Sequence, residues 1–307
     1  MNALAYGRAN LAARVGSAVG ALSPGAYLSL TKPRVVSLVL FTAVVTTFAA
    51  ARGVPPWTTV LALLSSGALV AGGVAALNHY FDRDIDARME RTSHRPLVSG
   101  RIQRPALVAL GGTAAVVAGL AVAVLTSEAL ACAESAGAFT YVAVYTLWLK
   151  RRSVLGVVIG GATGSTAVLG GWAAVDPALG LAPWLLAALV FLWTPPHFWS
   201  LAIARLSEYR RAGVPTLPVV AGPRCAARWS AVHILGTVAA SLWLGAAAQL
   251  GAVYFSVALL AGLIFLMSGL QLLVRPVPVV AWRTFKLSGA YLGLVFLGLL
   301  VDVLTRA

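Results

Sequence analysis

Acidic side chains are scarce in this sequence, so their positions are informative. Only 9 of the 307 residues are Asp or Glu, and four of them lie within residues 82–90. Asn78, Asp82 and Asp86 follow one another at a spacing of four residues, so a helix running through them would point all three from one face. An amide oxygen and two carboxylates, without a cluster of thiolates or imidazoles, suit Mg²⁺ rather than Zn²⁺. The pattern predicts a Mg²⁺ site.

Basic side chains surround these acids and complete the chemistry. The neighbouring arginines are Arg83, Arg88, Arg91, Arg95, Arg101 and Arg104. Metal ions and guanidinium groups together bind phosphate oxygens, and Arg does so with two parallel hydrogen bonds. Beside an apolar segment, this combination favours an amphiphile with a diphosphate head and an apolar tail. The alternative is a charged loop in which Asp and Arg pair only with each other. That alternative leaves the stripe of Asn78, Asp82 and Asp86 unexplained.

A second polar stretch follows another apolar segment. Pro195 and Pro196 lie inside that segment, and Arg205 and Glu208 follow it. Proline breaks or kinks a helix, and the freed backbone groups must then line protein or water. We therefore expect a cavity here, with Glu208 reaching across it to hold a second Mg²⁺.

The elements that must position these side chains are membrane helices. The sequence is 60% apolar and 10% charged, against about 25% charged residues in soluble domains. Apolar runs of roughly 20 residues, each long enough to cross a bilayer, recur throughout. The expected fold is an all-α integral membrane bundle of nine transmembrane helices, in which the cytoplasmic loops after helices 2 and 6 cap a central cavity. The expected spans are 34–51, 58–78, 105–125, 130–149, 154–174, 183–203, 229–248, 252–273 and 285–304.

The net charge of +14 is explained by orientation in the membrane. Of the 23 Lys and Arg residues, 21 fall in the N-terminal tail and in alternate connections between spans. The positive-inside rule then predicts a multi-pass protein of the cell membrane, with a cytoplasmic N-terminus and an external C-terminus. Nucleic acid is excluded as a partner because the basic residues form no soluble face. Residues 1–27 are expected to be a cytoplasmic tail, and residues 28–307 a single membrane domain.

Several motifs resemble those of the UbiA prenyltransferase superfamily, and within it the haem farnesyltransferase branch. The similar stretches are 30–34, 78–86, 91–102, 145–151, 195–199 and 212–219. The Pro195–Trp199 block and the Gly-Val-Pro-x-Leu-Pro block that begins at Gly213 are typical of the haem branch. Two positions depart from the family pattern: a single Glu208 stands where an Asp precedes the Tyr, and Thr216 stands where Met is common. The first departure leaves the ligand set of a second Mg²⁺ open.

The resemblance implies a reaction and a set of residues. Farnesyl would pass from farnesyl diphosphate to a vinyl group of haem B, with addition of water, to give haem O and diphosphate. Mg²⁺ would be the cofactor, and the product would be handed to a haem A synthase or a terminal oxidase. The implied metal ligands are Asn78, Asp82, Asp86 and Glu208; the catalytic residues are Asp82, Asp86, Tyr145 and Lys150; the diphosphate-binding residues are Lys32, Arg34, Arg91, Arg95 and Arg205. For each basic residue, the alternative role is anchoring at the membrane surface.

The acceptor and its ligand have alternatives too. An aromatic acceptor, either a quinone precursor or a chlorophyll-like ring, would use the same donor site. A transporter is disfavoured because its polar site would lie near the bilayer midplane rather than at one surface. Haem iron often takes His as a ligand, and His197, beside the two prolines, is the first candidate, with His79 the second. The alternative for His197 is a hydrogen bond to a carbonyl freed by Pro195 or Pro196.

Overall fold

The protein is a bundle of helices. The computed structural model describes residues 24–307, and within this range there are helices, turns and loops but no strands. The expected N-terminal tail, 1–27, lies mostly outside the described residues, and its last residues belong to helix α2 (Pro24–Leu30). The prediction of an all-α protein is confirmed.

Eight helices in the described chain are long and apolar enough to cross a membrane, each with 19 to 29 residues. They make the chain a multi-pass membrane protein. Their bounds are α3 Pro33–Ala51, α4 Trp57–Phe81, α6 Pro105–Thr126, the continuous run Glu128–Arg151, α10 Leu181–Ala204, α13 Gly222–Ala247, α14 Ala252–Val274 and α15 Pro278–Arg306. The run Glu128–Arg151 consists of α7 (Glu128–Phe139), a π-helix (Thr140–Trp148) and a 3₁₀ turn (Leu149–Arg151).

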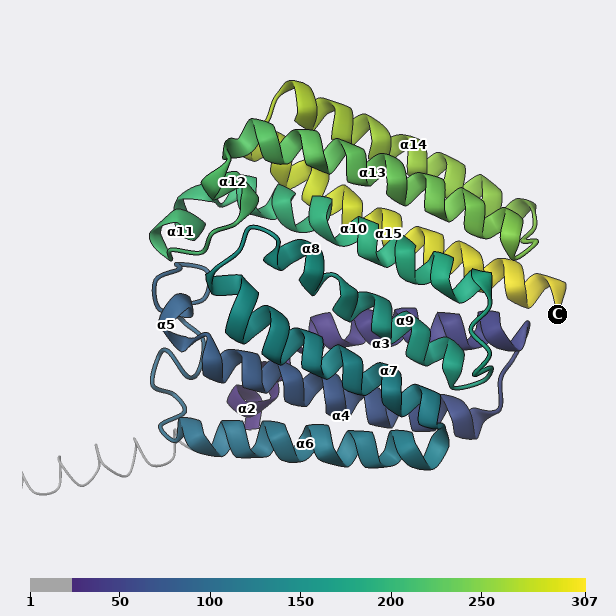
Figure 1. The fold of residues 1–307 in the computed structure, drawn as a ribbon, viewed down its shortest axis with the longest axis horizontal. Coiled ribbons are helices and arrows are strands. Elements are labelled where there is room, and N and C mark those ends of the chain that lie inside the picture. The colour runs from purple at the N-terminus through teal and green to yellow at the C-terminus, as the bar shows by residue number, and fades with distance from the viewer. Residues whose placement is uncertain (1–23) are drawn as a thin grey trace, which may run out of the picture.

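The expected span 154–174 differs from the others because it is divided. Helix α8 (Gly156–Gly160) and helix α9 (Ala162–Ala173) meet at Gly161. Neither reaches the length of a membrane helix, so helix length does not confirm the count of nine. Figure 1 shows α8 and α9 following one another across the bundle.

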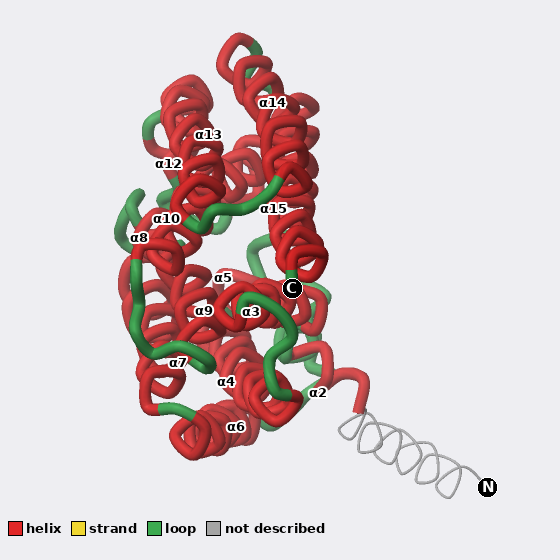
Figure 2. The backbone as a smooth tube through the Cα atoms, turned by 90° about the vertical axis from the view of Figure 1, so that its right-hand side faces the viewer, coloured by secondary structure: helices red, strands yellow, loops and turns green. Residues whose placement is uncertain are grey.

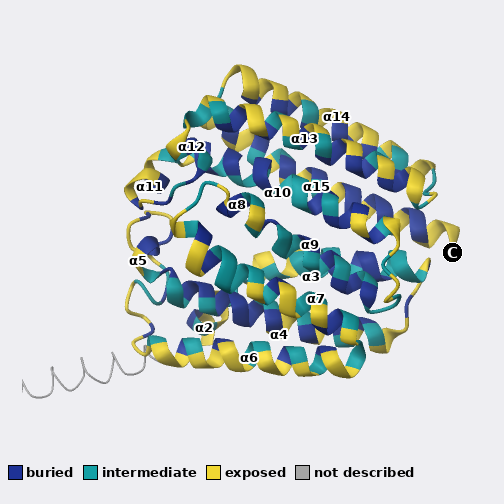
Figure 3. Cartoon of the chain, in the orientation of Figure 1, coloured by how far each residue is buried: buried dark blue, intermediate teal, exposed yellow. Residues whose placement is uncertain are grey.

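The helices pack side by side in an elongated bundle (Figures 1 and 2). Helix α4 packs on α6 and α3, α9 packs on α3, α7 and α10, and α10 packs on α13 and α15. The short helices α5 (Arg83–Asp86), α11 (Leu206–Arg211) and α12 (Leu217–Val220) lie together at one end, opposite the C-terminus of α15. Buried residues face the interior and exposed apolar residues face outward (Figure 3), as expected of a surface that contacts lipid.

Proline lies in the first turn of several helices, and two prolines lie inside a helix without ending it. Helices α13 and α15 begin at Gly222 and Pro278, earlier than expected, because proline is favoured in the first turn, where its missing N–H costs nothing. Pro195 and Pro196 lie inside α10, yet α10 is one helix from Leu181 to Ala204. The expectation at these prolines is a break or a kink, and the continuous helix excludes the break.

A glycine sets the close approach of α3 and α9. A Cβ added at Gly171 would overlap the Ala43 carbonyl oxygen and the Thr46 hydroxyl oxygen. At this crossing the Thr47 hydroxyl donates a 2.9 Å hydrogen bond to the Gly171 carbonyl. Small residues at such crossings allow membrane helices to approach closely. This contact fixes α3 beside the divided helix α8–α9.

We expect Gly171→Ala to lower the free energy of unfolding by about 1–3 kcal/mol, because the added methyl group meets backbone that cannot rotate away. The measurement is reversible unfolding in detergent. Gly293→Ala is the matched control, since nothing lies within 4 Å of the added Cβ there. Equal stability of the two variants would contradict the role of Gly171.

Candidate active site

The stripe of Asn78, Asp82 and Asp86 spans the end of one helix and the start of the next. Helix α4 ends at Phe81, and Asp82 links it to α5. The backbone nevertheless keeps its helical spacing, since the Asp82 N–H donates to the Asn78 carbonyl at 2.9 Å and the Asp86 N–H donates to the Asp82 carbonyl at 2.8 Å. The three side chains therefore lie along one side of the chain, at the end of the bundle that carries α5 and α11.

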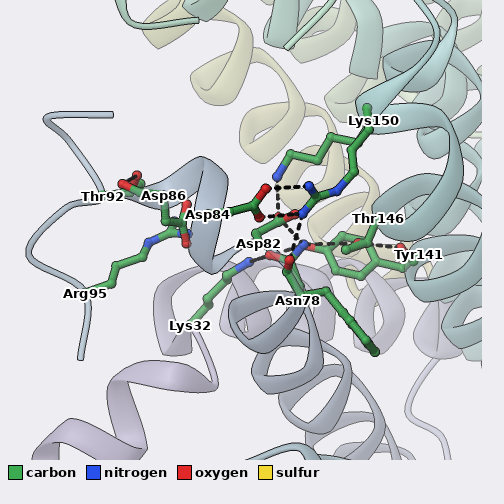
Figure 4. Close-up of polar contacts among 12 residues, drawn as sticks. Lys32, Asn78, Asp82, Asp84, Asp86, Thr92, Arg95, Tyr141, Thr146 and Lys150 are labelled. Carbon is green, nitrogen blue, oxygen red and sulfur yellow. Dashed lines mark hydrogen bonds and ion pairs between the residues drawn. The ribbon is translucent and has the colours of Figure 1, made fainter. Parts of the chain in front are cut away.

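Asn78 and Asp82 form the centre of a buried polar network (Figure 4). The Lys32 ammonium donates to the Asn78 amide oxygen at 2.5 Å. The Asn78 amide nitrogen donates to Asp82 Oδ2 at 2.7 Å and to the Thr146 hydroxyl at 3.1 Å. Lys150 forms a hydrogen-bonded ion pair with Asp82 Oδ2. Segments far apart in sequence thus meet around one carboxylate.

Arg151 closes the outer side of this network. Its guanidinium makes two 2.7 Å hydrogen bonds to the two oxygens of Asp84, and it also donates to the Phe81 carbonyl at 2.7 Å. Hydrogen bonding to Arg151 lowers the pKa of Asp84 to about 2. The same guanidinium lies 3.9 Å from Asp82 Oδ1, which is buried and has no hydrogen-bond partner among the described residues.

Lys32 is held in the site by an unusual backbone conformation. Its φ of 51° is left-handed, and Pro33 follows it as the first residue of α3. Besides Asn78, its ammonium contacts the Tyr141 hydroxyl at 3.3 Å. Burial first, and then the nearby Arg95 charge, lower the pKa of Lys32 to about 8. A cation kept in such surroundings is available to a phosphate that displaces its present partners.

A π-helix presents the aromatic side of the cavity. In Thr140–Trp148 the Thr146 hydroxyl donates to the Tyr141 carbonyl at 2.7 Å, five residues back. Tyr141 and Tyr145 both line the cavity, and a Cβ at Gly160 would lie 2.7 Å from the Tyr145 ring. Single π-helical turns often occur at functional sites. The sequence reasoning missed Tyr141 and Thr146, because residues inside an apolar segment give no sign of the register that turns them inward.

The network opens onto a cavity of about 400 Å³ that residues of α5 and α11 help to line. Predicted residues at its wall are Lys32, Asn78, Asp86, Arg91, Arg95, Tyr145 and Lys150. Asp86 is paired with Arg95 at 2.5 Å. Lys32 and Tyr141 also line an adjoining apolar tunnel of about 150 Å³ between α3, α4, α7 and α9. A polar cavity with an apolar extension matches the shape of an amphiphile.

Four predicted residues other than the histidines are absent from the cavity wall, and the first of them is Asp82, which is fully buried within the network. Arg34 is exposed and lines neither cavity. Arg205 lies over the Trp282 ring at 5.5 Å and contacts Glu208 at 3.5 Å. Glu208 is buried and accepts the Arg91 backbone N–H at 3.4 Å, so it joins the two loops rather than facing Asp82 and Asp86. The Arg91 backbone N–H and the Arg205 guanidinium thus contact its two carboxylate oxygens.

The oxygen donors around Asp82 decide whether a metal ion fits this site. Within residues 24–307, no group of three or more His, Cys, Asp or Glu side chains is close enough to hold one. The predicted set that includes Glu208 is therefore not assembled. Asn78, Asp82 and Asp86 still offer only hard oxygen ligands, and the unpaired Asp82 Oδ1 has the chemistry that Mg²⁺ prefers. A few protein oxygens completed by substrate phosphates are sufficient for Mg²⁺, so these three residues fit it.

Comparison with known proteins decides the family. The sequence profile of the UbiA prenyltransferase family matches residues 39–296. The chain belongs to the UbiA prenyltransferase family. It is 41% identical over 276 residues to a protoheme IX farnesyltransferase of Roseiflexus castenholzii, covering 90% of this chain and 52% of that one. It is 44% identical over 278 residues to a protoheme IX farnesyltransferase of Alkalilimnicola ehrlichii, covering 90% and 91%. The resemblance to the haem branch is confirmed.

The chain spans about half the length of the first of these relatives, and nearly all of the second. Solved structures show the same fold at low identity. A digeranylgeranylglyceryl phosphate synthase matches with a TM-score of 0.78 at 17% identity, covering 92% of this chain and 98% of that one. A UbiA homologue from Archaeoglobus fulgidus, bound to DMAPP and Mg²⁺, matches with a TM-score of 0.62 at 17% identity, covering 89% and 98%.

The two candidate haem ligands lie in different surroundings. His197 stacks on Trp193 with ring centroids 4.4 Å apart and lies 4.5 Å from Phe285. Its Nδ1 shares a 2.7 Å hydrogen bond with the Ser288 hydroxyl, so the expected alternative, a bond to a freed carbonyl, is wrong. His79 is 4% exposed, and neither ring nitrogen has a hydrogen-bond partner within the described chain. Neither histidine lines the cavity.

The buried pair of Asp82 and Lys150 yields a prediction about stability. We expect Lys150→Met to lower the free energy of unfolding by about 3 kcal/mol, because it leaves a buried carboxylate without its cation. Adding Asp82→Asn should recover part of this loss in a double-mutant cycle measured by unfolding in detergent.

The control cycle uses Asp84→Asn and Arg151→Met, whose side chains are 50% and 33% exposed. An exposed pair should couple by less than about 1 kcal/mol. Equal coupling in the two cycles would mean that burial does not strengthen the Asp82–Lys150 pair.

Proposed function

We propose that the protein is a Mg²⁺-dependent prenyltransferase that moves a farnesyl group from farnesyl diphosphate to a vinyl group of haem B. The observation that carries this proposal is the buried pair of Asn78 and Asp82, ringed by cations, beside a polar cavity that Asn78 lines and that adjoins an apolar tunnel. Relatives at 41% and 44% identity bear the name protoheme IX farnesyltransferase, which supports the farnesyl donor and the haem acceptor.

The cationic side chains bind the donor at its diphosphate. Lys32, Arg91, Arg95 and Lys150 all line the cavity. Asn78, Asp82 and Asp86 would hold Mg²⁺, which when bound would supply positive charge at the departing diphosphate. Fixed positive charge at this point stabilises the leaving group more than the bound substrate, which is what accelerates bond cleavage. Arg34 and Arg205 lie outside this wall, and we assign them to the membrane surface.

The remaining residues protect the allylic cation that forms when the farnesyl carbon–oxygen bond breaks. Tyr145 and Phe198 line the same cavity, and aromatic faces stabilise a cation electrostatically. The apolar tunnel excludes water from the tail and from the cation. The vinyl carbon of haem B then forms the new carbon–carbon bond. Water adds to the resulting cation on the haem side and releases a proton, which gives the hydroxyl group of haem O.

We infer that the site faces the cytoplasm. The loops that carry Arg91, Arg95 and Glu208 lie at one end of the bundle, and they are rich in the Lys and Arg residues that the positive-inside rule places in the cytoplasm. The C-terminus of α15 lies at the opposite end (Figure 1), which supports an external C-terminus. This arrangement corresponds to a protein of the cell membrane, with the product passing to a haem A synthase or a terminal oxidase.

We further propose that haem docks against α10 and α15 through His197. The ring is oriented by Ser288 through Nδ1 and flanked by Trp193 and Phe285, which leaves Nε2 as the nitrogen that would ligate iron. A hydrogen bond on one ring nitrogen is the usual way in which proteins orient a metal-binding imidazole. His79 is less suitable because its ring is enclosed.

The function is tested with purified protein in lipid vesicles, supplied with farnesyl diphosphate, haem B and Mg²⁺. We expect haem O, identified by chromatography and mass, and we expect EDTA to stop its formation and Mg²⁺ to restore it. Transfer only to a phenolic ring such as 4-hydroxybenzoate would replace haem with an aromatic acceptor. Folded protein that transfers farnesyl to neither acceptor would overturn the enzymatic proposal.

Asp82→Asn tests the role of Asp82 in catalysis separately from the folding of the helix bundle. The variant should lose about 100-fold or more in kcat, because it removes a carboxylate ligand of the Mg²⁺ whose positive charge would stabilise the departing diphosphate. Glu90→Gln is the control, since Glu90 is an exposed acid of the same loop. Near wild-type turnover by Asp82→Asn, at Mg²⁺ levels titrated back after EDTA, would contradict the role of Asp82.

His197→Ala should shift the Soret band of bound haem and weaken haem binding while leaving the affinity for farnesyl diphosphate unchanged, because His197 lies outside the diphosphate cavity. His94→Ala, in the exposed part of the first loop, is the control. An unchanged spectrum together with unchanged haem affinity would exclude His197 and leave His79 as the remaining candidate.

A further inference from the structure

A polar pair interrupts the apolar tunnel between α3, α4, α7 and α9. Glu134 of α7 is the only acid among the tunnel's lining residues within the described chain. Its Oε1 accepts a 2.8 Å hydrogen bond from the hydroxyl of Ser66, which is fully buried on α4. Its Oε2 is buried and has no hydrogen-bond partner in the described residues.

Packing does not account for this acid. A carboxyl group inside a membrane helix is costly, and such residues usually mark a functional site. An unpaired buried oxygen adds a further cost, which an apolar side chain of similar size would avoid. The rest of the wall is mostly aliphatic or glycine, with Thr163 and Thr166 of α9 as neutral hydroxyls, and no basic residue of residues 24–307 forms an ion pair with Glu134.

The depth of the pair can be measured along α4. A Cβ added at Gly67 would lie 3.7 Å from Glu134 Oε1, which places the acid at the level of Gly67. Gly67 precedes Asn78 by 11 residues in the same helix, and a helix rises about 1.5 Å per residue, so the acid lies about 16 Å from the diphosphate end of the cavity. This is comparable to the length of an extended farnesyl chain.

The tunnel continues for another helical turn beyond the acid. Leu63 on α4 and Leu130 on α7 line this last part, together with Ala43 and Gly170. Leu40 of α3 faces Gly67, 2.8 Å from where a Cβ would lie, yet the lining continues past this level to Leu63 and Leu130. Glu134 is what changes the polarity of the wall at this level.

We propose that Glu134 and Ser66 are specificity-determining residues that limit the length of the prenyl donor; this inference rests on the proposed prenyltransferase function. A farnesyl tail ends at the pair and leaves its hydrogen bond intact. A tail longer by one isoprene unit must place apolar carbons against the carboxyl group and its unpaired oxygen to reach Leu63 and Leu130. The polar pair therefore discriminates against geranylgeranyl diphosphate.

The test measures binding of unreactive geranyl, farnesyl and geranylgeranyl thiolodiphosphates, with Mg²⁺, to the full-length protein in lipid vesicles. We expect Glu134→Leu to raise the affinity for the geranylgeranyl analogue relative to the farnesyl analogue by about tenfold, the scale set by a buried polar group that loses its partner. Ser66→Ala should shift the ratio in the same direction. Glu128→Gln is the matched control, because Glu128 lies on the same helix but is exposed and outside the tunnel, and its ratio should stay at the wild-type value.

An unchanged ratio in both Glu134→Leu and Ser66→Ala would overturn the inference. If Glu134→Leu does not fold, the result for Ser66→Ala decides alone. The assay needs no acceptor, so its outcome is separate from the test with haem B. If the affinity ratio shifts but the protein does not transfer farnesyl to haem, the inference about donor length is supported. Only the proposal that haem is the acceptor is then contradicted. Wild-type protein that binds none of the three analogues would overturn both.

Discussion

The site depends on the burial of one carboxylate at the end of a membrane helix. Asp82 has no exposed surface, and removing a charge from water is costly unless a partner compensates. Lys150 supplies the opposite charge, Asn78 supplies a hydrogen bond, and Arg151 lies beyond them. Because these partners come from different helices, satisfying Asp82 requires the end of α4 and the end of the run Glu128–Arg151 to meet. The same requirement draws in Lys32, which binds Asn78 from the start of α3.

The charged groups compensate one another only in part, which suits them for a phosphate ligand. Lys32, Arg95 and Lys150 each pair with a group that we assign to metal binding. A diphosphate with its metal ion would offer stronger charge-assisted contacts to the same cations. The network is therefore compatible with two arrangements: cations on the protein's own oxygens, and cations on phosphate with the oxygens on the metal.

Three irregular stretches of backbone lie where the cavity is. The π-helix Thr140–Trp148, the break at Gly161 and the left-handed Lys32 all border the cavity or the adjoining tunnel. In a membrane, such backbone is tolerated only where protein or a polar cavity satisfies its free groups. The outer helices α6 and α14 have no such feature within the described residues, and they expose apolar side chains over most of their length.

The sequence by itself determined the class of fold and the chemistry of the first loop. Long apolar segments admit only helices in a bilayer, and polar residues in such a chain are too costly to be scattered, so Asn78, Asp82 and Asp86 are distinguished by their types and spacing alone, whereas Lys150 was identified only through the family resemblance. Tertiary structure decided which of them meet. It turned Glu208 toward Arg91 and Arg205 toward Trp282, left Arg34 outside, and brought in Tyr141 and Thr146 through a π-helical register. It also placed Glu134 beside Ser66, 68 residues apart in sequence. These outcomes depend on which faces of separate helices pack together, and in a uniformly apolar chain the periodicity of hydrophobic residues does not specify that choice.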